Sequence, residues 1–488
     1  MLRCTCRCRT GPSASSVPSL RPPQVSAANF SPSSPTPNAS LHTSSRPHPR
    51  APASLGVFDG RTGRLSEPGG GAQRRSVSDG QTFRGPHGTV KVNLKNKATV
   101  GAAQSRGERP YQEDTYLTTS LSLPLSALRI NILDDRLGSH WAPLPQHLEG
   151  FEGEHGEDKE ERRRQVACFG VFDGHGGSPT SQYLSHSLPS LIESARARDI
   201  PAEIDAYRAQ GGYLRRYRGG VLERFRAEKV QEAKERGDFV RGMSAGEMAA
   251  LGFLKADNHV LSTPSEFSRS GSVGTLALLH SLDLPHSHPF YSSSLLSLTL
   301  AHLGDTSALL LSSASGRAYR LTQAHHPDSR TEMERLRTTG TGVITDSFGE
   351  SRWGGMLANT RGVGDREFKS LGVIAEPEVV KRVFKGPDFA SLLLLSDGIT
   401  DALSDQEIAD LVRLEIYAAR GRKELASPER AARRVVGLAE DVGAEDNLTC
   451  LVIPLPGWSK LQGLDTTLSR REYRVRQAST RGGSRQRG

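Results

Sequence analysis

The sequence predicts an α+β fold in which packed β-sheets are flanked by helices. Short apolar runs rich in Leu, Val and Ile recur along the chain, as is typical of strands buried on both faces. These runs come in groups, and segments with helical spacing form separate blocks instead of alternating with them. With 35% hydrophobic and 24% charged residues, the 488-residue chain also has the composition of a globular protein.

The expected strands and helices follow in order along the chain. Apolar or alternating patterns predict strands at residues 89–104, 166–172, 271–282, 294–305, 307–313, 317–322, 342–348, 378–384, 389–398 and 447–455. Apolar residues at helical spacing predict helices at residues 178–198, most of 203–262, 331–340, 404–421 and 428–442. Residues 124–165 end in dense mixed charge without an apolar face, which predicts a solvated insertion loop.

The two ends of the chain differ in charge from its middle. Residues 1–58 contain six Arg and no Lys or acidic residue, and residues 459–488 contain eight basic residues against two acidic ones. Each end carries +6 of a total formal charge of +9, so the 400 residues between them carry −3. A nucleic-acid-binding domain is expected to hold its basic residues in the folded part, and no nucleic-acid partner is predicted.

Residues 1–58 are rich in Ser and Pro, and their Arg residues begin at position 3. This composition is typical of an organellar transit peptide, since acidic residues would oppose entry into an internally negative compartment. Residues 41–45, LHTSS, also resemble the cleavage region of fungal mitochondrial precursors. We therefore expect a protein of the mitochondrial matrix or intermembrane space; the alternative is a disordered tail without a targeting role on a cytosolic protein.

The composition shifts predict four segments. Residues 1–58 are the leader, residues 59–94 a Gly/Arg/Ser-rich linker, residues 95–457 one folded domain, and residues 458–488 a basic disordered tail suited to contact with a membrane surface. The longest uncharged stretch, residues 284–304, contains two Pro and three His, so no transmembrane segment is predicted.

Two cysteines, Cys168 and Cys450, lie in the expected folded domain, each within an apolar run. Small buried hydrophobic residues explain them better than a disulfide or a catalytic thiol.

Carboxylates lie where several of the predicted strands end or turn. They are Glu113, Asp114, Asp173, Asp305, Asp365, Asp397 and Asp446. A single Asp beside Gly commonly caps a turn or a helix. Several at converging strand ends would instead place like charges in one cleft, where divalent cations relieve the repulsion. Oxygen ligands without a His/Cys set at zinc spacing favour Mg²⁺ or Mn²⁺.

Asp173 is the candidate for a carboxylate that bridges two metal ions. Gly174 follows it, and the absence of a Cβ would let its carbonyl approach an ion. A bridged pair of ions holds a shared water as hydroxide. His175, in the same turn, suits proton donation to a leaving group, although an exposed turn histidine is the simpler interpretation of that residue alone.

The ordered series of motifs resembles the metal-dependent type 2C (PPM) serine/threonine protein phosphatases. The motifs are RPYQED, FGVFDGHGG, SGSVGTLALL, LAHLGDTSALLL, LANTRGVGDREFK, GVIAEPEV, LLLLSDGITDALSDQE and EDNLTCLVI. The resemblance covers about residues 95–455. It implies a four-layer αββα sandwich of two antiparallel sheets flanked by helices, with a binuclear Mg²⁺ or Mn²⁺ centre at one end.

The resemblance assigns roles by position. It implies metal contacts from the bridging Asp173, the carbonyl of Gly174, Glu113, Asp397 and Asp446, with Asp305 near a weaker third ion. It implies that Asp114 holds a coordinated water, Arg109 grips the substrate phosphate, His175 is the general acid, and Arg361 and Asp365 border a substrate-facing flap.

The activity implied by the resemblance is hydrolysis of phosphoserine and phosphothreonine in proteins by direct attack of a metal-activated water. Phosphorylated proteins are the expected partners of a monomeric enzyme. The segments GDTSA and SDGITD depart from the family's Gly-Asp-Ser-Arg and from its tryptophan after Ser-Asp-Gly, but neither change removes a ligand. A pseudophosphatase is therefore the weaker alternative.

Overall fold

The structure, a computed structural model, describes most of residues 78–462. The described ranges are residues 78–85, 88–133, 140–144, 163–212, 220–225, 242–267, 269–284, 288–337, 343–345, 351–355, 357–422 and 424–462, with residues 229, 231 and 235. The expected leader, and the expected tail after residue 462, lie outside them.

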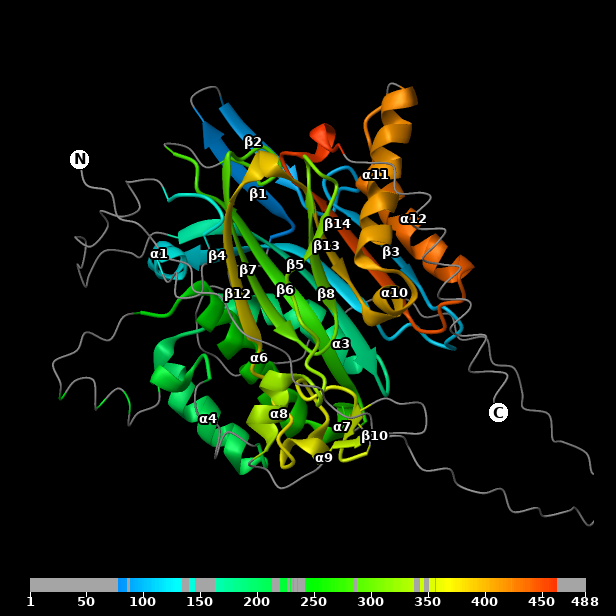
Figure 1. Cartoon of the computed structure of the whole chain (residues 1–488). Coiled ribbons are helices and arrows are strands. Elements are labelled where there is room, and N and C mark those ends of the chain that lie inside the picture. The colour runs from blue at the N-terminus through cyan, green and yellow to red at the C-terminus, as the bar shows by residue number, and fades with distance from the viewer. Residues whose placement is uncertain are drawn as a thin grey trace, which may run out of the picture. The chain divides into compact units, whose positions relative to one another are not determined.

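Two five-stranded antiparallel sheets form the centre of the protein (Figure 1). Sheet I has the order β12 (Glu378–Lys385), β7 (Leu295–Leu303), β6 (Gly271–Ser281), β5 (Arg163–His175) and β4 (Thr115–Pro124). Sheet II has the order β3 (Gly101–Ser105), β14 (Leu448–Pro454), β13 (Phe389–Leu395), β8 (Ser307–Ser312) and β9 (Ala318–Arg320).

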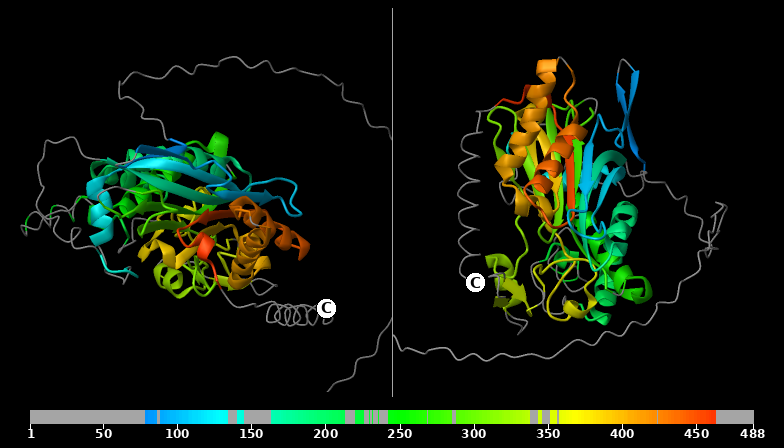
Figure 2. Two further views of the ribbon diagram at one scale, coloured as in Figure 1. Left: turned by 90° about the horizontal axis from the view of Figure 1, so that it is seen from above. Right: turned by 90° about the vertical axis from the view of Figure 1, so that its right-hand side faces the viewer.

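Helices cover the outer faces of both sheets (Figure 2). On sheet I lie α3 (Pro179–Glu193) and α6 (Ala245–Ser262). The helix α4 (Ile200–Ala209) packs against α6, and α7 (Pro264–Phe267) packs against both α3 and α6. On sheet II lie α10 (Asp397–Ala402), α11 (Asp405–Arg422) and α12 (Pro428–Asp441). The four layers confirm the predicted αββα sandwich.

Smaller elements complete the described part of the chain. They are β1 (Gly80–Gly85), β2 (Gly88–Asn93), α1 (Leu125–Leu133), η2 (Ala197–Asp199), η4 (Glu223–Phe225), α8 (Arg330–Leu336), β10 (Val343–Thr345), β11 (Ser351–Trp353), α9 (Arg366–Lys369), η5 (Gly386–Asp388) and η6 (Trp458–Lys460).

The long apolar run in β5 reflects its position between two cores. Cys168 and Phe172 point toward the helices on sheet I, whereas Phe169 and Val171 point into the core between the sheets. Because alternate residues of a strand face opposite sides, a strand with two buried faces reads as continuously apolar. Cys168 and Cys450 are both buried and free of disulfides, as predicted, and burial raises the pKa of both thiols.

Several segments differ from the sequence-based expectation, among them residues 115–124, which form β4 although no strand is predicted there. Residues 80–93, within the expected linker, form the β1–β2 hairpin. Residues 125–133, within the expected loop, form α1, whose Ala127 and Leu128 are buried. The single strand expected over residues 89–104 is two strands, β2 and β3, separated by a turn. In the part of the chain that the structure describes, no helix combines the length and apolarity needed to cross a membrane.

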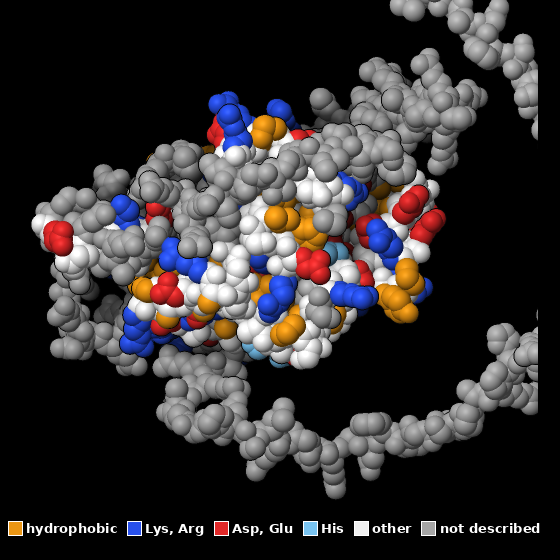
Figure 3. Space-filling model, turned by 90° about the horizontal axis from the view of Figure 1, so that it is seen from below, with side chains coloured by type: hydrophobic (Ala, Val, Ile, Leu, Met, Phe, Trp, Pro, Cys, Tyr) orange, Lys and Arg blue, Asp and Glu red, His pale blue; other side chains and the backbone are white. Residues whose placement is uncertain are grey.

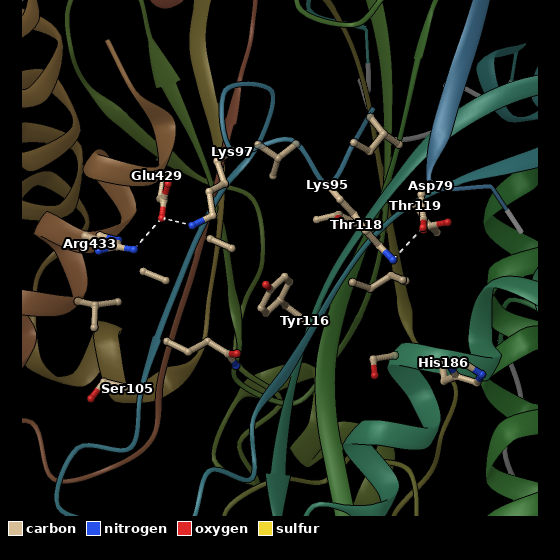
Figure 4. A pocket seen from close by; sticks show the side chains of 18 of the residues that line it. Asp79, Lys95, Lys97, Ser105, Tyr116, Thr118, Thr119, His186, Glu429 and Arg433 are labelled. Atoms are coloured by element: carbon tan, nitrogen blue, oxygen red, sulfur yellow. Dashed lines mark hydrogen bonds and ion pairs between the residues drawn. The ribbon is translucent and has the colours of Figure 1, made fainter. Parts of the chain in front are cut away.

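A groove of about 920 Å³ lies between the edge strands β3 and β4, near α3 and α12 (Figure 4). Most of its charged side chains are paired: Glu429 lies between Lys97 and Arg433, and Lys95 lies 2.8 Å from Asp79. None of the predicted site residues lines this groove.

Candidate active site

Strand register brings the predicted carboxylates to one end of the sandwich. β4 begins at Thr115, which pairs with Phe172 of β5, so Glu113 and Asp114 precede β4 beside the end of β5. The end of β5 carries Asp173. In an antiparallel pair, one strand begins where its neighbour ends, which explains why residues about sixty apart in sequence meet here.

Sheet II supplies carboxylates to the same end. Leu395, the last residue of β13, pairs with Ser307 at the start of β8, so Asp397 and Asp305 flank this pair. Asp446 precedes β14, whose first residue Leu448 pairs with the last residue of β3. The electrostatic effect of Asp397, Asp114 and Asp305 on Asp173 shows that the two sheets contribute to one cluster.

Burial and mutual repulsion raise the pKa values of this carboxylate cluster. Burial, and then Asp397, Asp114 and Asp305, raise the pKa of Asp173 well above its ordinary value. Burial is also the main cause that raises the pKa of Asp397 to about 7, with repulsion from Asp305 and Asp446. The pKa of Asp114 is likewise raised to about 7, mainly by burial, despite a hydrogen bond from Thr449. A largely enclosed cluster of this kind, in which Asp114 is buried and the other carboxylates are partly buried, favours any cation that can replace the protons.

The donor atoms are of the type that a hard divalent cation prefers, but among the described residues no three His, Cys, Asp or Glu side chains already converge on one metal position. Oδ1 of Asp114 and Oδ1 of Asp305 are buried and have no hydrogen-bond partner among the described residues. Mg²⁺ and Mn²⁺ prefer oxygen ligands, and several carboxylates near one another supply both the oxygens and the charge. Burial raises the pKa of Asp305, so its orphaned oxygen is also costly without a cation.

The backbone position of Gly174 leaves no room for a side chain. A Cβ at this position would overlap with the backbone oxygen of Glu113 and touch Oγ of Ser181. The Ser181 hydroxyl donates to that same Glu113 oxygen. The backbone of Gly174 therefore packs directly against the Glu113 loop, and the requirement for glycine at this position agrees with a close backbone approach.

Arg109 contacts the carboxylate cluster at its exposed rim. Its Nη2 lies 2.8 Å from Oδ2 of Asp446, and both side chains are about half exposed. This position, beside an exposed carboxylate and within reach of solvent, gives the guanidinium access to an incoming anion.

His175 is held by Asp365. Its Nε2 lies 2.7 Å from Oδ1 of Asp365, and the histidine side chain is 43% exposed. Because a carboxylate accepts, Nε2 is the donor and Nδ1 remains available. Burial lowers the pKa of His175, but Asp365, then Asp305 and Glu113, act against it, and the net pKa is raised.

Asp365 has an unusual backbone conformation. Its φ of 53° makes it the one non-glycine residue with a left-handed backbone in the described part of the chain. Such a conformation costs about 1 kcal/mol or more and persists where the surroundings enforce it. Gly271 leaves the necessary room, because a Cβ there would overlap with both His175 and Asp365.

The Arg361 side chain is largely buried and is paired with a glutamate of α8. Its Nη2 lies 2.6 Å from Oε1 of Glu332, and the arginine side chain is 13% exposed. Glu332 is fully buried and also pairs with Arg335 at 2.6 Å. Burial alone would raise the pKa of Glu332, but Arg335 and Arg361 outweigh it and hold that pKa well below its ordinary value. The described residues of the segment from α8 to α9 (330–337, 343–345, 351–355 and 357–369), here termed the flap, are thus anchored through Glu332.

Several residues of the site are missing from the candidates taken from the sequence. Asn359 donates to Oδ2 of Asp305 at 2.7 Å, and Thr449 donates to Oδ2 of Asp114 at 2.7 Å. Asn447 accepts from the Glu113 amide at 2.6 Å. Asp401 raises the pKa of Asp305. Asp401 follows Asp397 by four residues, a spacing that places two carboxylates on one helical face and would have identified it.

Thr400 stands where the family pattern has tryptophan. Its hydroxyl donates to the backbone oxygen of Asp397 at 3.3 Å, within the first turns of α10. The substitution therefore adds a local hydrogen bond and leaves the Asp397 carboxylate in the cluster.

On the face seen from below, basic and acidic side chains are interspersed among the described residues (Figure 3).

Comparison with known proteins points to one family. The family model for protein phosphatase 2C matches residues 206–448. Protein phosphatase 2C homolog 4 of Schizosaccharomyces pombe is 37% identical over 297 residues, which cover 60% of this chain and 72% of the relative. Protein phosphatase 1K, mitochondrial, of Xenopus laevis is 31% identical over 304 residues, covering 62% of this chain and 65% of the relative.

Among solved structures, a phosphatase from a pathogenic strain of Toxoplasma gondii is similar over 78% of this chain and 94% of its own, with a TM-score of 0.46 and 19% identity. The range matched by the family model contains Asp305, Asp397 and Asp446, whereas residues 109–175 precede it.

Proposed function

The chain belongs to the protein phosphatase 2C family, a family of metal-dependent protein phosphatases, and we propose that it hydrolyses phosphoserine and phosphothreonine in proteins with Mg²⁺ or Mn²⁺ as cofactor. The observation that carries the proposal is the convergence of strand ends from both sheets, which brings Asp114 and the partly buried Asp173 and Asp397 close enough to repel one another. A pseudophosphatase usually lacks one or more metal-binding residues, whereas Asp173, Asp397 and Asp446 are all present.

The residues that would hold two ions are Asp173 as the bridge, the Gly174 carbonyl, Glu113, Asp397 and Asp446, with Asp305 beside a third. When bound, the ions supply charge that offsets the phosphoryl oxygens and lower the pKa of a water for direct attack on phosphorus. Asp114, held by Thr449 at 2.7 Å, orients water at the edge of the cluster.

Arg109 and His175 act on the substrate itself. A guanidinium fork matches two phosphate oxygens, and an incoming phosphate competes with Asp446 for Arg109. His175, in its protonated form, donates a proton from Nδ1 to the departing serine or threonine oxygen while Asp365 holds Nε2. Displacement by water in one step needs no covalent phosphoenzyme.

The proposal is tested with phosphopeptides. The purified chain with Mn²⁺ is expected to release phosphate from phosphothreonine and phosphoserine peptides, and Asp397→Asn is expected to abolish nearly all of this release. The family resemblance also implies resistance to okadaic-type inhibitors. Release of phosphate from phosphotyrosine peptides alone would contradict the proposed specificity.

We also propose that the protein acts in mitochondria. The acid-free, Arg-containing composition of residues 1–58 supports this location, as does the similarity to a relative whose name states that it is mitochondrial. Fusing residues 1–58 to a fluorescent reporter tests the proposal. Co-localisation with mitochondria is expected, and a diffuse cytosolic signal would refute it.

A further inference from the structure

A fully buried ion pair lies beneath the loop that carries Asp365. Nζ of Lys369 lies 2.7 Å from Oδ2 of Asp257, and both side chains are 0% exposed. Asp257 belongs to α6 and Lys369 ends α9, so the pair joins the helical layer on sheet I to the flap. Neither residue belongs to the carboxylate cluster or to the predicted site.

Both members of the pair also bind the loop backbone. Asp257 accepts from the Gly364 amide at 2.8 Å through Oδ1. Lys369 donates to the Gly362 carbonyl at 2.8 Å. The pair therefore holds the backbone on the N-terminal side of Asp365 at two points. The ring of Tyr207, 5.9 Å from Nζ of Lys369, lies over the ammonium and is itself fully buried.

These contacts account for the strained conformation of Asp365. Gly364 has a φ of 87° and Asp365 one of 53°, so the chain turns sharply between two left-handed residues. The Asp257 carboxylate accepts a hydrogen bond from the Gly364 amide and so fixes that residue. The Oδ1 atom of Asp365 then lies 2.7 Å from Nε2 of His175. Without the anchors, the loop would relax toward ordinary backbone angles and withdraw that carboxylate.

Stability alone is a weak reason for such a pair. A buried ion pair costs so much desolvation that apolar residues of similar volume are often equally stable or more so. A pair that holds two backbone groups beside a catalytic side chain has a geometric role instead.

We propose that Asp257 and Lys369 are positioning residues, which hold the 362–365 loop so that Asp365 orients His175 for proton donation to the leaving group. This inference rests on the proposed phosphatase function. It predicts that loss of the pair affects leaving groups that need a proton much more than those that do not.

The test compares two substrates. A threonine alkoxide needs protonation as it departs, whereas p-nitrophenolate is a stable anion at neutral pH. The double variant Asp257→Leu, Lys369→Met replaces the ion pair with apolar side chains and removes both backbone anchors. We expect its kcat to fall about 10²-fold with a phosphothreonine peptide and to change less than about threefold with p-nitrophenyl phosphate.

A second measurement places the effect on His175. In a His175→Gln background, the double variant is expected to cause no further loss with the phosphopeptide, because the two changes act through one group. The matched control is Asp410→Leu, Arg413→Met, which removes a buried pair on α11 (0% and 4% exposed). Its kcat should change by the same factor with both substrates. If the double variant unfolds, Asp257→Asn with Lys369→Gln provides a milder pair.

The outcomes separate the two proposals. In one outcome, the wild-type enzyme is active while the double variant shows an equal fall in kcat with both substrates, or no fall with either. Such a result overturns the positioning role and leaves the phosphatase function standing. A wild-type chain that hydrolyses neither substrate overturns the proposed function and this inference with it.

Discussion

At the scale of single residues, Asp173 concentrates the electrostatic demands of the site. It is placed by β5, and burial together with three other carboxylates raises its pKa well above the ordinary value. A carboxylate in that position is unfavourable to the fold unless a cation or a proton neutralises it.

Asp173→Asn is expected to reduce kcat/KM toward a phosphothreonine peptide by more than about 100-fold, beyond the loss typical of residues that only orient ligands. In EDTA, the same variant should unfold at the same or a higher temperature than wild type, because one repelling charge is gone. A variant that keeps wild-type activity would show that Asp173 is not a ligand.

Gly271→Ala tests the room left for the His175–Asp365 pair. The added Cβ would overlap with both side chains, so phosphopeptide turnover should fall by about 10²-fold. Gly437→Ala is the matched control. Its Cβ meets nothing within 4 Å and it lies inside α12, so stability should rise by up to about 1 kcal/mol with activity unchanged. Equal activity of the two variants would contradict the placement of the pair.

The sequence could point to the carboxylates because most of them lie beside the end of an apolar strand, but it could not point to the groups that hold them. Asn359 and Thr449 bond to Asp305 and Asp114 across gaps of 54 and 335 residues. Asp257 likewise reaches Gly364 from another layer of the fold. Such pairings depend on the tertiary arrangement, which no local pattern encodes.

At the scale of elements, the flap depends on one buried side chain. Glu332 of α8 pairs with Arg335 and Arg361 and accepts from the Thr360 hydroxyl at 2.7 Å. The family resemblance implies that Arg361 borders a substrate-facing flap, and this pairing makes Arg361 an anchor for the segment that carries Asp365.

Glu332→Gln is expected to lower the free energy of unfolding by about 3 kcal/mol, because it leaves buried arginines without their carboxylate. Chemical denaturation measures the change. Glu334→Gln, two residues further along the same helix, removes an exposed pair with Arg330 and should cost less than about 0.5 kcal/mol. Comparable losses in the two variants would show that the flap is not anchored through Glu332.

The elements that the sequence predicted best are those with two buried faces. β5 and β13 read as continuous apolar runs because each lies between a helical layer and the core between the sheets. The sequence did not reveal α1, whose pattern is short and uncapped, or β4, whose Thr and Ser residues are buried by packing that no local pattern shows.

At the scale of the whole molecule, the carboxylate cluster links stability to pH. The pKa values of Asp114 and Asp397 rise from 3.8 to about 7 in the folded protein. The folded state therefore binds protons more tightly than the unfolded state, and this contribution to stability is lost as pH rises from about 4 to about 7. In EDTA, the free energy of unfolding should decrease over that interval.

With Mn²⁺ present, the same titration should show no such decrease, because the cation replaces the protons that leave the cluster. Thermal unfolding at several pH values with and without Mn²⁺ measures both slopes. Identical pH dependence in the two conditions would mean that the cluster does not bind the ion.

The most direct test of a cation-dependent carboxylate site is hydrolysis of a phosphothreonine peptide by the purified chain after removal of metal. Activity is expected to disappear in excess EDTA and to return when Mn²⁺ or Mg²⁺ is added beyond the chelator, in wild type but not in Asp173→Asn. Full activity in excess EDTA would contradict the metal-dependent mechanism.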